Sequence, residues 1–212
     1  MRTTGLAKIA ATVMLAAVLS LAGCVSAQKV DSSFDLKSIG GNEGIIVASM
    51  VQDRSGWTSY SNVGFLYRDK DGNNRGRVAY SAGLPGFNVG QRESDIVKVY
   101  KLPAGQYEFY DFDMFIGSPV GTTEFSAREE YSIPFTVKPG QVTYIGEIKL
   151  IPRTGRNIFG LPIPGGGRFI LSDQRSRDMA LLRANYPNFA AARVEHRPLR
   201  GGNAPPDLVS FR

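Results

Sequence analysis

Apolar residues alternate with polar ones, or form short continuous runs, over most of the chain between residues 43 and 172. The run 44–51 is rich in β-branched residues, which is typical of a buried strand. Strands are also predicted at 63–68 and 77–80. Asp71-Gly72 between them predicts a hairpin, because these residues tolerate the positive φ of tight turns. No helical period of useful length appears here, so the pattern predicts a mainly β fold.

A weak internal repeat marks two further turns. Residues 102–109 (LPAGQYEF) are echoed by residues 137–144 (VKPGQVTY). In each copy an apolar strand end precedes a Pro/Gly turn, where proline presets φ and glycine supplies the reversal. We therefore predict two antiparallel pairs, 96–102 with 106–115 and 131–137 with 141–151.

Residues 152–167 (PRTGRNIFGLPIPGGG) are predicted to form a long Gly/Pro loop. Long loops carry function more often than their share of the chain. The apolar centre of this loop therefore makes it a candidate docking loop, with Ile158, Phe159, Leu161 and Ile163 as its contact residues.

The C-terminal part of the chain predicts one helix and a tail. Ser172-Asp173 can cap a helix over about 174–185, and Tyr186-Pro187 ends it. Residues 197–212 are rich in proline and glycine, which predicts a disordered tail.

The first 23 residues have the pattern of a signal peptide. Arg2 and Lys8 precede an apolar stretch from Ile9 to Leu21, which is too short for a comfortable membrane span of ~20 residues. The stretch ends in Leu21-Ala22-Gly23-Cys24, which resembles the lipobox of bacterial lipoproteins at all four positions. The alternative is an ordinary secretory signal in which Cys24 is incidental.

The lipobox resemblance implies acyl chains on Cys24 and cleavage of the leader before it. Two or more acyl chains give stable membrane attachment. Val25, in place of aspartate, resembles enterobacterial lipoproteins that are sorted to the outer membrane. Residues 24–42 are polar and without a period, which predicts a flexible tether with a reach of about 25 Å.

The composition limits the kinds of catalytic and metal site that the chain can hold. Cys24 is the only cysteine and His196 the only histidine, so an internal disulfide is impossible and most zinc sites and Ser–His–Asp or Cys–His nucleophiles are excluded. A net charge of +6 without a basic helix or stripe gives no case for nucleic-acid binding. We expect no catalytic residues, no metal and no cofactor, and the oligomeric state stays open.

Two acidic patterns have structural explanations. Asp69, Asp71 and Asn73 have the spacing that opens a calcium-binding EF-hand loop, but Asn74 and Tyr80 occupy the positions of its glycine and final glutamate, so a hairpin turn is favoured. Asp111 and Asp113 share a strand face and could bind a metal. A strand end reaching solvent explains them equally well.

Two further groups leave alternatives open. Arg193, His196, Arg197 and Arg200 could contact anionic head groups, lipopolysaccharide phosphates or the cell wall, or simply be a solvated tail. Trp57 and Tyr60 could stack on a sugar, or cap the core.

The turns LPAGQY and VKPGQVTYIGEI, followed by a short helix ending in Tyr-Pro, resemble a group of uncharacterised bacterial lipoproteins. The domain of that group resembles the prealbumin-like β-sandwich of carboxypeptidase regulatory domains. The resemblance covers about residues 94–187. It implies a single antiparallel β-sandwich of the prealbumin or immunoglobulin kind, with seven to nine strands and a short C-terminal helix, over residues 43–196. It transfers no catalytic residues.

These patterns favour a non-enzymatic lipoprotein of the bacterial envelope, anchored through Cys24 in the outer membrane, facing the periplasm and binding another envelope protein. The alternative is a glycan- or lipid-binding module with a pocket lined by Trp57, Tyr60 or the loop 158–164. A hydrolase is disfavoured because the chain lacks a nucleophile elbow and has only one histidine.

Overall fold

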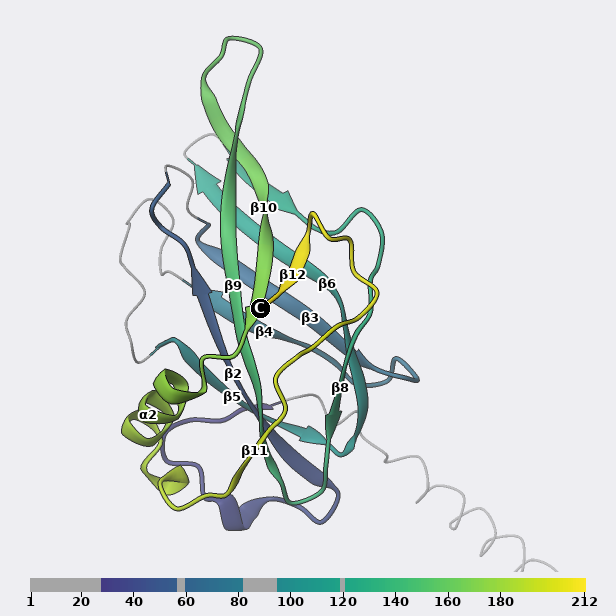
Figure 1. The fold of residues 1–212 in the computed structure, drawn as a ribbon, viewed down its shortest axis with the longest axis vertical. Helices are drawn as coiled ribbons and strands as arrows, with labels where there is room; N and C mark the ends of the chain where they lie inside the picture. The colour runs from purple at the N-terminus through teal and green to yellow at the C-terminus, as the bar shows by residue number, and fades with distance from the viewer. Residues whose placement is uncertain (1–27, 57–59, 82–94, 119–120) are drawn as a thin grey trace, which may run out of the picture.

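The computed structural model describes residues 28–56, 60–81, 95–118 and 121–212, which form two β-sheets and one short helix (Figure 1). The strands of the larger sheet are β1 (Gln28–Lys29), β2 (Glu43–Gln52), β5 (Val97–Pro103), β9 (Val142–Arg156), β10 (Pro162–Ser172), β11 (Val194–His196) and β12 (Val209–Phe211). Those of the smaller sheet are β3 (Asn62–Asp69), β4 (Arg75–Ser81), β6 (Gly105–Ser118), β7 (Gly121–Phe125) and β8 (Ile133–Val137). The helical elements are α2 (Arg175–Asn185) and the 3₁₀ turns η1 (Leu36–Ser38) and η3 (Pro187–Phe189).

The larger sheet has the order β1-β5-β2-β9-β10-β12, with β11 beside the start of β9. The smaller sheet has the order β4-β3-β6-β7, with β8 beside the start of β6. The expected all-antiparallel arrangement is wrong, because β2–β9, β9–β11 and β10–β12 are parallel pairs. The described residues also hold twelve strands, more than the seven to nine expected.

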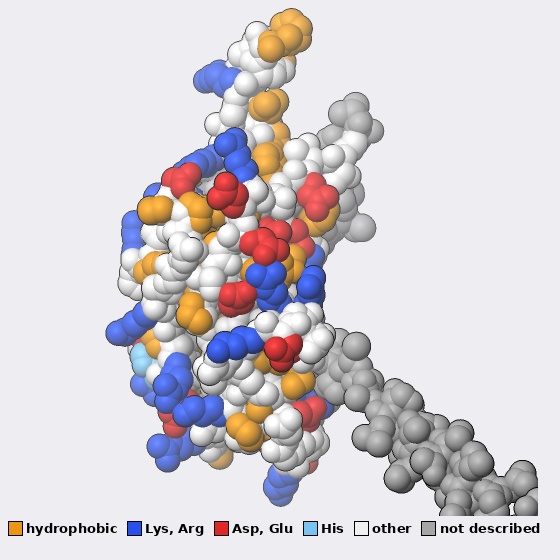
Figure 2. Space-filling model, turned by 90° about the vertical axis from the view of Figure 1, so that its right-hand side faces the viewer, with side chains coloured by type: hydrophobic (Ala, Val, Ile, Leu, Met, Phe, Trp, Pro, Cys, Tyr) orange, Lys and Arg blue, Asp and Glu red, His pale blue; other side chains and the backbone are white. Residues whose placement is uncertain are grey.

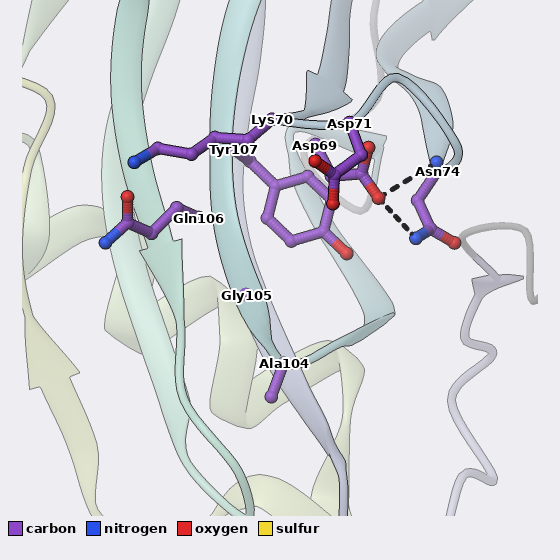
Figure 3. A pocket seen from close by; sticks show the side chains of 8 residues that line it. All are labelled: Asp69, Lys70, Asp71, Asn74, Ala104, Gly105, Gln106 and Tyr107. Carbon is purple, nitrogen blue, oxygen red and sulfur yellow. Dashed lines mark hydrogen bonds between the residues drawn. The ribbon is translucent and has the colours of Figure 1, made fainter.

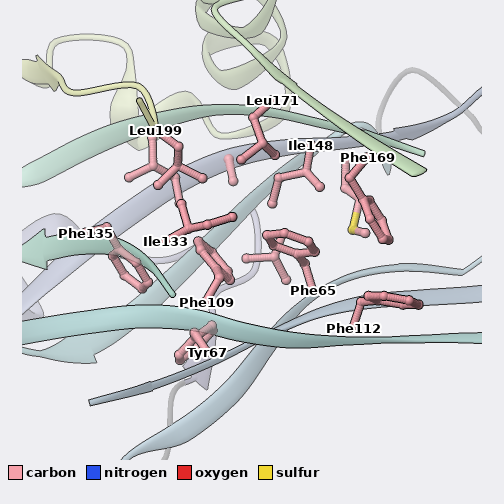
Figure 4. Packing of buried hydrophobic residues seen from close by; sticks show 14 of the residues in the cluster. Phe65, Tyr67, Phe109, Phe112, Ile133, Phe135, Ile148, Phe169, Leu171 and Leu199 are labelled. Atoms are coloured by element: carbon pink, nitrogen blue, oxygen red, sulfur yellow. The ribbon is translucent and has the colours of Figure 1, made fainter. Parts of the chain in front are cut away.

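The facing sides of the two sheets share one apolar core. Phe65 of β3 lies at its centre, with ring centroids 4.9 Å from Phe109 of β6 and 5.0 Å from Phe169 of β10 (Figure 4). Because β3 and β10 belong to different sheets, these aromatic contacts hold the two layers together.

A second core covers the outer face of the larger sheet. Met179 and Leu182 of α2 and Phe189 of η3 pack there against Val47 and Tyr144. The larger sheet is therefore buried on both faces, which explains the nearly continuous apolar run of β2.

Three local predictions are confirmed. The run 44–51 lies within β2, and β3 and β4 form the predicted antiparallel hairpin with Gly72 at a φ of 71°. The helix predicted over 174–185 is α2, and Asp173 accepts a hydrogen bond from the Arg175 N–H at its start.

The two strand pairs predicted from the internal repeat are wrong. Both turns carry the chain from one sheet to the other: β5 pairs with β1 and β2 but β6 with β3, and β8 pairs with β6 but β9 with β2. A Pro/Gly turn predicts that the chain reverses. The partner of the returning strand depends on which sheet buries its apolar face.

Gly44 of β2 lies against the second of these turns, and a side chain there would overlap the carbonyl oxygen of Lys138 and lie 2.8 Å from Val137 Cγ1. We expect Gly44→Ala to lower the free energy of unfolding by about 1–3 kcal/mol. The new methyl group would meet the backbone carbonyl of Lys138, which cannot move aside as a flexible side chain could. Gly41→Ala is the matched control, since its added carbon would meet nothing within 4 Å. Urea unfolding followed by circular dichroism measures the stability of both variants. Equal unfolding midpoints would contradict the close approach of Gly44 to the Lys138 carbonyl.

The flexible tether predicted over residues 24–42 is wrong for residues 28–42, here called the N-terminal segment. β1 pairs with β5, Val30 is buried, and three further apolar side chains pack against the second core, namely Phe34, Leu36 and Ile39. The few apolar residues of this polar stretch are the ones that pack against the outer face of the larger sheet. Residues 24–27 lie outside the described part of the chain.

The disordered tail predicted over 197–212 is also wrong. Leu199 and Val209 are buried in the core between the sheets, β12 adds a parallel strand to β10, and Asn203 bridges to Ser132. Proline and glycine set the turns of this segment along the surface. The buried side chains of Leu199 and Val209 hold it against the core.

Candidate functional site

The ends of β9 and β10 form a hairpin that extends beyond the rest of the larger sheet (Figure 1). β9 pairs with β2 only as far as Leu150, and β10 pairs with β12 only over residues 169–171. Residues 151–168 therefore extend by roughly 20 Å, at ~3.3 Å per strand residue. The long loop predicted over 152–167 is corrected to this hairpin, with a tip of residues 157–161.

Four large apolar side chains are exposed at and beside the tip, and Figure 2 shows hydrophobic side chains at the projecting end of the molecule. Their exposed fractions are 92% for Ile158, 78% for Phe159, 59% for Leu161 and 39% for Ile163. They are the four residues predicted for the docking loop, and their exposure is confirmed. Large contiguous patches of exposed apolar side chains mark interaction surfaces of soluble proteins.

The tip is held by hydrogen bonds between two side chains and its own backbone. The Asn157 carboxamide oxygen accepts hydrogen bonds from the N–H groups of Phe159 and Leu161, each at 3.0 Å, and the Arg156 guanidinium donates to the Gly160 carbonyl at 2.7 Å. Gly160 supplies the positive φ of the turn. The apolar side chains are therefore presented from an ordered turn, which lowers the entropy lost on binding.

The base of the hairpin is anchored in the core. The Tyr60 hydroxyl donates to the Gly166 carbonyl at 2.9 Å, and the Tyr60 ring meets Phe125 edge to face. Burial raises the pKa of Tyr60 to about 12, which keeps the hydroxyl protonated as a donor. Because Tyr60 is fully buried, the sugar-stacking role considered for it is wrong; Trp57 lies outside the described residues.

The hairpin carries positive charge only. Residues 151–168 contain Arg153, Arg156 and Arg168 and no acidic residue. All three arginines are exposed, and the described contacts of Arg153 and Arg156 are with backbone carbonyls. A partner that fits this hairpin would combine an apolar recess with a neutral or acidic border.

A buried polar network lies beneath α2. The Asp178 carboxylate is fully buried and accepts hydrogen bonds from Ser49 Oγ at 2.6 Å and the Tyr144 hydroxyl at 2.7 Å. Arg177 lies 2.6 Å from Asp178 and 2.7 Å from Glu147. Burial, with the bond to Asp178, raises the pKa of Tyr144 above its ordinary value, so the phenol remains a donor. The network fixes α2 to the sheet.

A β-bulge places this network and was missed by the sequence analysis. Gly146 has a φ of 103°, and the register between β2 and β9 shifts there. The shift lets Tyr144 and Glu147, three residues apart, face the same side of the sheet. The signal available in the sequence was Gly146, which lies between Ile145 and Ile148. These two isoleucines are also three residues apart, and both face the core.

The basic cluster considered around His196 is divided by the structure. The His196 ring stacks on Tyr144 and its Nε2 atom lies 2.8 Å from Asp173. Burial raises the pKa of Asp173, but His196 and the Arg175 N–H outweigh it and hold that pKa below its ordinary value. Arg193 lines a cavity beside α2, whereas Arg200 lines a different one with Phe211 and Arg212.

A shallow cavity of about 310 Å³ lies between the β3–β4 turn and the start of β6 (Figure 3). The Asp69 carboxylate accepts hydrogen bonds there from the backbone N–H groups of Asn73 and Asn74, so it serves the turn. Within the described ranges, His, Cys, Asp and Glu residues form no cluster of three that could hold a metal ion.

The paired carboxylates of β6 are also engaged by the fold. Asp113 forms an ion pair with Arg77 at 2.6 Å, and Asp111 accepts the Ala127 N–H at 2.9 Å. Burial raises the pKa of Asp113, opposed by the Arg77 guanidinium. The two side chains have separate partners, as expected of structural residues.

The predicted lipidation site, Cys24, and its preceding residues Leu21, Ala22 and Gly23 lie outside the described part of the chain. Among the helices that the structure does describe, none has the length and apolar character needed to cross a membrane.

Comparisons with known proteins place the chain in no family. No family model matches it, and no curated protein is similar to it. Among solved structures, it is similar to part of a leucine-rich repeat protein from Bacteroides thetaiotaomicron, with 12% identity over 53% of this chain and a TM-score of 0.29. The chain spans 14% of the length of that protein.

Proposed function

We propose that this protein is a non-enzymatic lipoprotein of the bacterial envelope, anchored through acyl chains on Cys24 in the outer membrane and facing the periplasm. It binds another envelope protein through the four apolar residues at and beside the hairpin tip, Ile158, Phe159, Leu161 and Ile163. The observation that carries the proposal is the exposure of these four apolar side chains on an ordered hairpin.

The scaffold suits this role. The core shared by the two sheets supports a β-sandwich as the framework from which the hairpin projects. Among the described residues, the pairing of β9 with β2 ends at Leu150 and that of β10 with β12 begins at Phe169. The apolar tip therefore projects beyond the sheet, where a partner protein can receive it.

The position of the anchor favours a protein over the anchoring membrane as the partner of the tip. Gln28, Lys101, Ile45 and Val142 lie in one row across the larger sheet, at the start of β9. The tip lies some 14 residues further along, which is ~45 Å at ~3.3 Å per residue. The four residue steps from Cys24 to Gln28 span at most ~14 Å, so a short link holds the opposite end of the domain near the membrane.

Photocrosslinking in the cells that make the protein tests this proposal. A photoreactive phenylalanine analogue at position 159 is expected to form an adduct with one envelope protein, because Phe159 is exposed at the tip. The matched control places the analogue at exposed Glu129, between β7 and β8, where no such adduct is expected.

The same experiment includes two tip substitutions. Ile158→Ser with Leu161→Ser is expected to reduce the adduct roughly 10-fold or more, since central apolar contacts each contribute about 2 kcal/mol to binding. Adducts with lipid or glycan at position 159 would favour the alternative binding module. Equal adducts at positions 159 and 129 would overturn a docking role for the tip.

A further inference from the structure

A cavity of about 530 Å³ opens on the outer face of the larger sheet, beside α2. Met179 and Leu182 of α2 and Phe189 of η3 lie beneath it and are almost fully buried. Its rim carries two arginines of α2, Arg175 and Arg183. Arg193, just before β11, adds a third. A cavity with three arginines on its rim is suited to an anion.

The rim charges are available to a ligand. Arg175 and Arg183 are exposed and have no ion-pair partner among the described residues. Arg193 is almost fully exposed and approaches Glu195 at 3.7 Å, which is a weak contact for a solvated pair. Guanidinium groups bind phosphate oxygens through paired N–H donors, so three of them around one opening favour a phosphate-bearing ligand.

The cavity lies beside the segment that leads to the anchor. The Phe189 ring is 6.4 Å from Phe34, and the Asn188 side chain donates to the carbonyls of Ser33 and Phe34 at 3.2 and 3.0 Å. Figure 1 shows α2 and the purple N-terminal segment towards one end of the molecule and the β9–β10 hairpin at the other. The acyl chains of Cys24 would therefore enter the bilayer near this cavity.

We propose that the cavity beside α2 binds the head group of an anionic phospholipid in the bilayer that holds the anchor. The three arginines contact the phosphate. This inference rests on the proposed anchoring at Cys24. The contact orients the domain, with α2 against the membrane and the hairpin tip directed away from it.

The buried network of Asp178 has a part in this arrangement. It fixes α2 to β2 and β9 through Ser49, Tyr144 and Glu147, so the arginines of α2 project from a rigid element. Two acidic side chains of the N-terminal segment, Asp31 and Asp35, accept local hydrogen bonds from Ser33 and Lys37.

A spin-label experiment on the mature, lipidated protein tests the proposal. Since Cys24 is the only cysteine and its sulfur carries lipid, a cysteine introduced at Ser176, on the cavity wall, is the single free thiol. The labelled protein is reconstituted into vesicles of phosphatidylcholine with or without phosphatidylglycerol, and collisions with a water-soluble nickel complex and with oxygen are measured. With phosphatidylglycerol, we expect the label to be shielded from nickel at head-group depth. A label at Pro162→Cys, in the hairpin, stays in water.

Matched charge variants complete the test. Arg175→Gln, Arg183→Gln and Arg193→Gln together are expected to abolish the shielding. The same three-charge change at Arg153, Arg156 and Arg168 leaves it intact. Equal nickel access with both lipids, or shielding that survives the cavity substitutions, overturns the inference while anchoring stands. Protein that does not remain with the vesicles and keeps a free Cys24 thiol overturns the anchoring, and the inference with it.

Discussion

Replacing Val209 with aspartate is expected to lower the free energy of unfolding by about 3–5 kcal/mol, the usual cost of a buried charge without a partner. Val209 is buried in the core between the sheets although it lies three residues from the end of a segment rich in proline and glycine. Urea unfolding followed by far-ultraviolet circular dichroism measures the loss.

Pro206→Asp is the control for this prediction. Pro206 lies in the same segment but is exposed, so the same new charge is expected to change stability by less than about 0.5 kcal/mol. A disordered tail would make the two variants alike. A clear difference between their unfolding midpoints therefore separates an ordered C-terminal segment from a disordered one.

Asp178→Ala is also expected to lower the free energy of unfolding by about 3–5 kcal/mol. Here a buried charge is removed, whereas Val209→Asp introduces one. The substitution removes the carboxylate that accepts from Ser49 and Tyr144 and neutralises Arg177, leaving buried polar groups without their acceptor. Asp178→Asn keeps an acceptor oxygen but not the charge, and a smaller loss is expected. Thermal unfolding of the purified variants gives the comparison.

Asp173→Ala is the matched control for this second prediction. Asp173 lies just before α2, and its side chain is one third exposed beside His196. Removal of a carboxylate that water already solvates is expected to cost about 1 kcal/mol or less. If Asp178→Ala were no more destabilising than Asp173→Ala, the buried network would not hold α2 to the sheet.

The amino-acid sequence by itself determined the features that depend on neighbours along the chain. The strand at 44–51, the Asp-Gly hairpin between β3 and β4, and the helix at 174–185 follow from β-branched runs, turn residues and helix-ending residues. The exposure of Ile158 and Phe159 was also predictable, because both lie inside an Asn-Ile-Phe-Gly turn followed by two prolines, and such connecting segments run on the surface.

Only the tertiary structure decided which strands pair, whether the two terminal segments are ordered, and where the polar network forms. The repeated Pro/Gly turns join different sheets, because each strand takes the neighbour that buries its apolar face. Leu199, Val209 and the apolar residues of 28–42 are too widely spaced to show a period. They become ordered because a surface formed by distant parts of the chain receives them. Ser49 and Asp178 are 129 residues apart and meet only once β2 and α2 have packed together. Contacts of this kind depend on long-range burial, which local propensity does not encode.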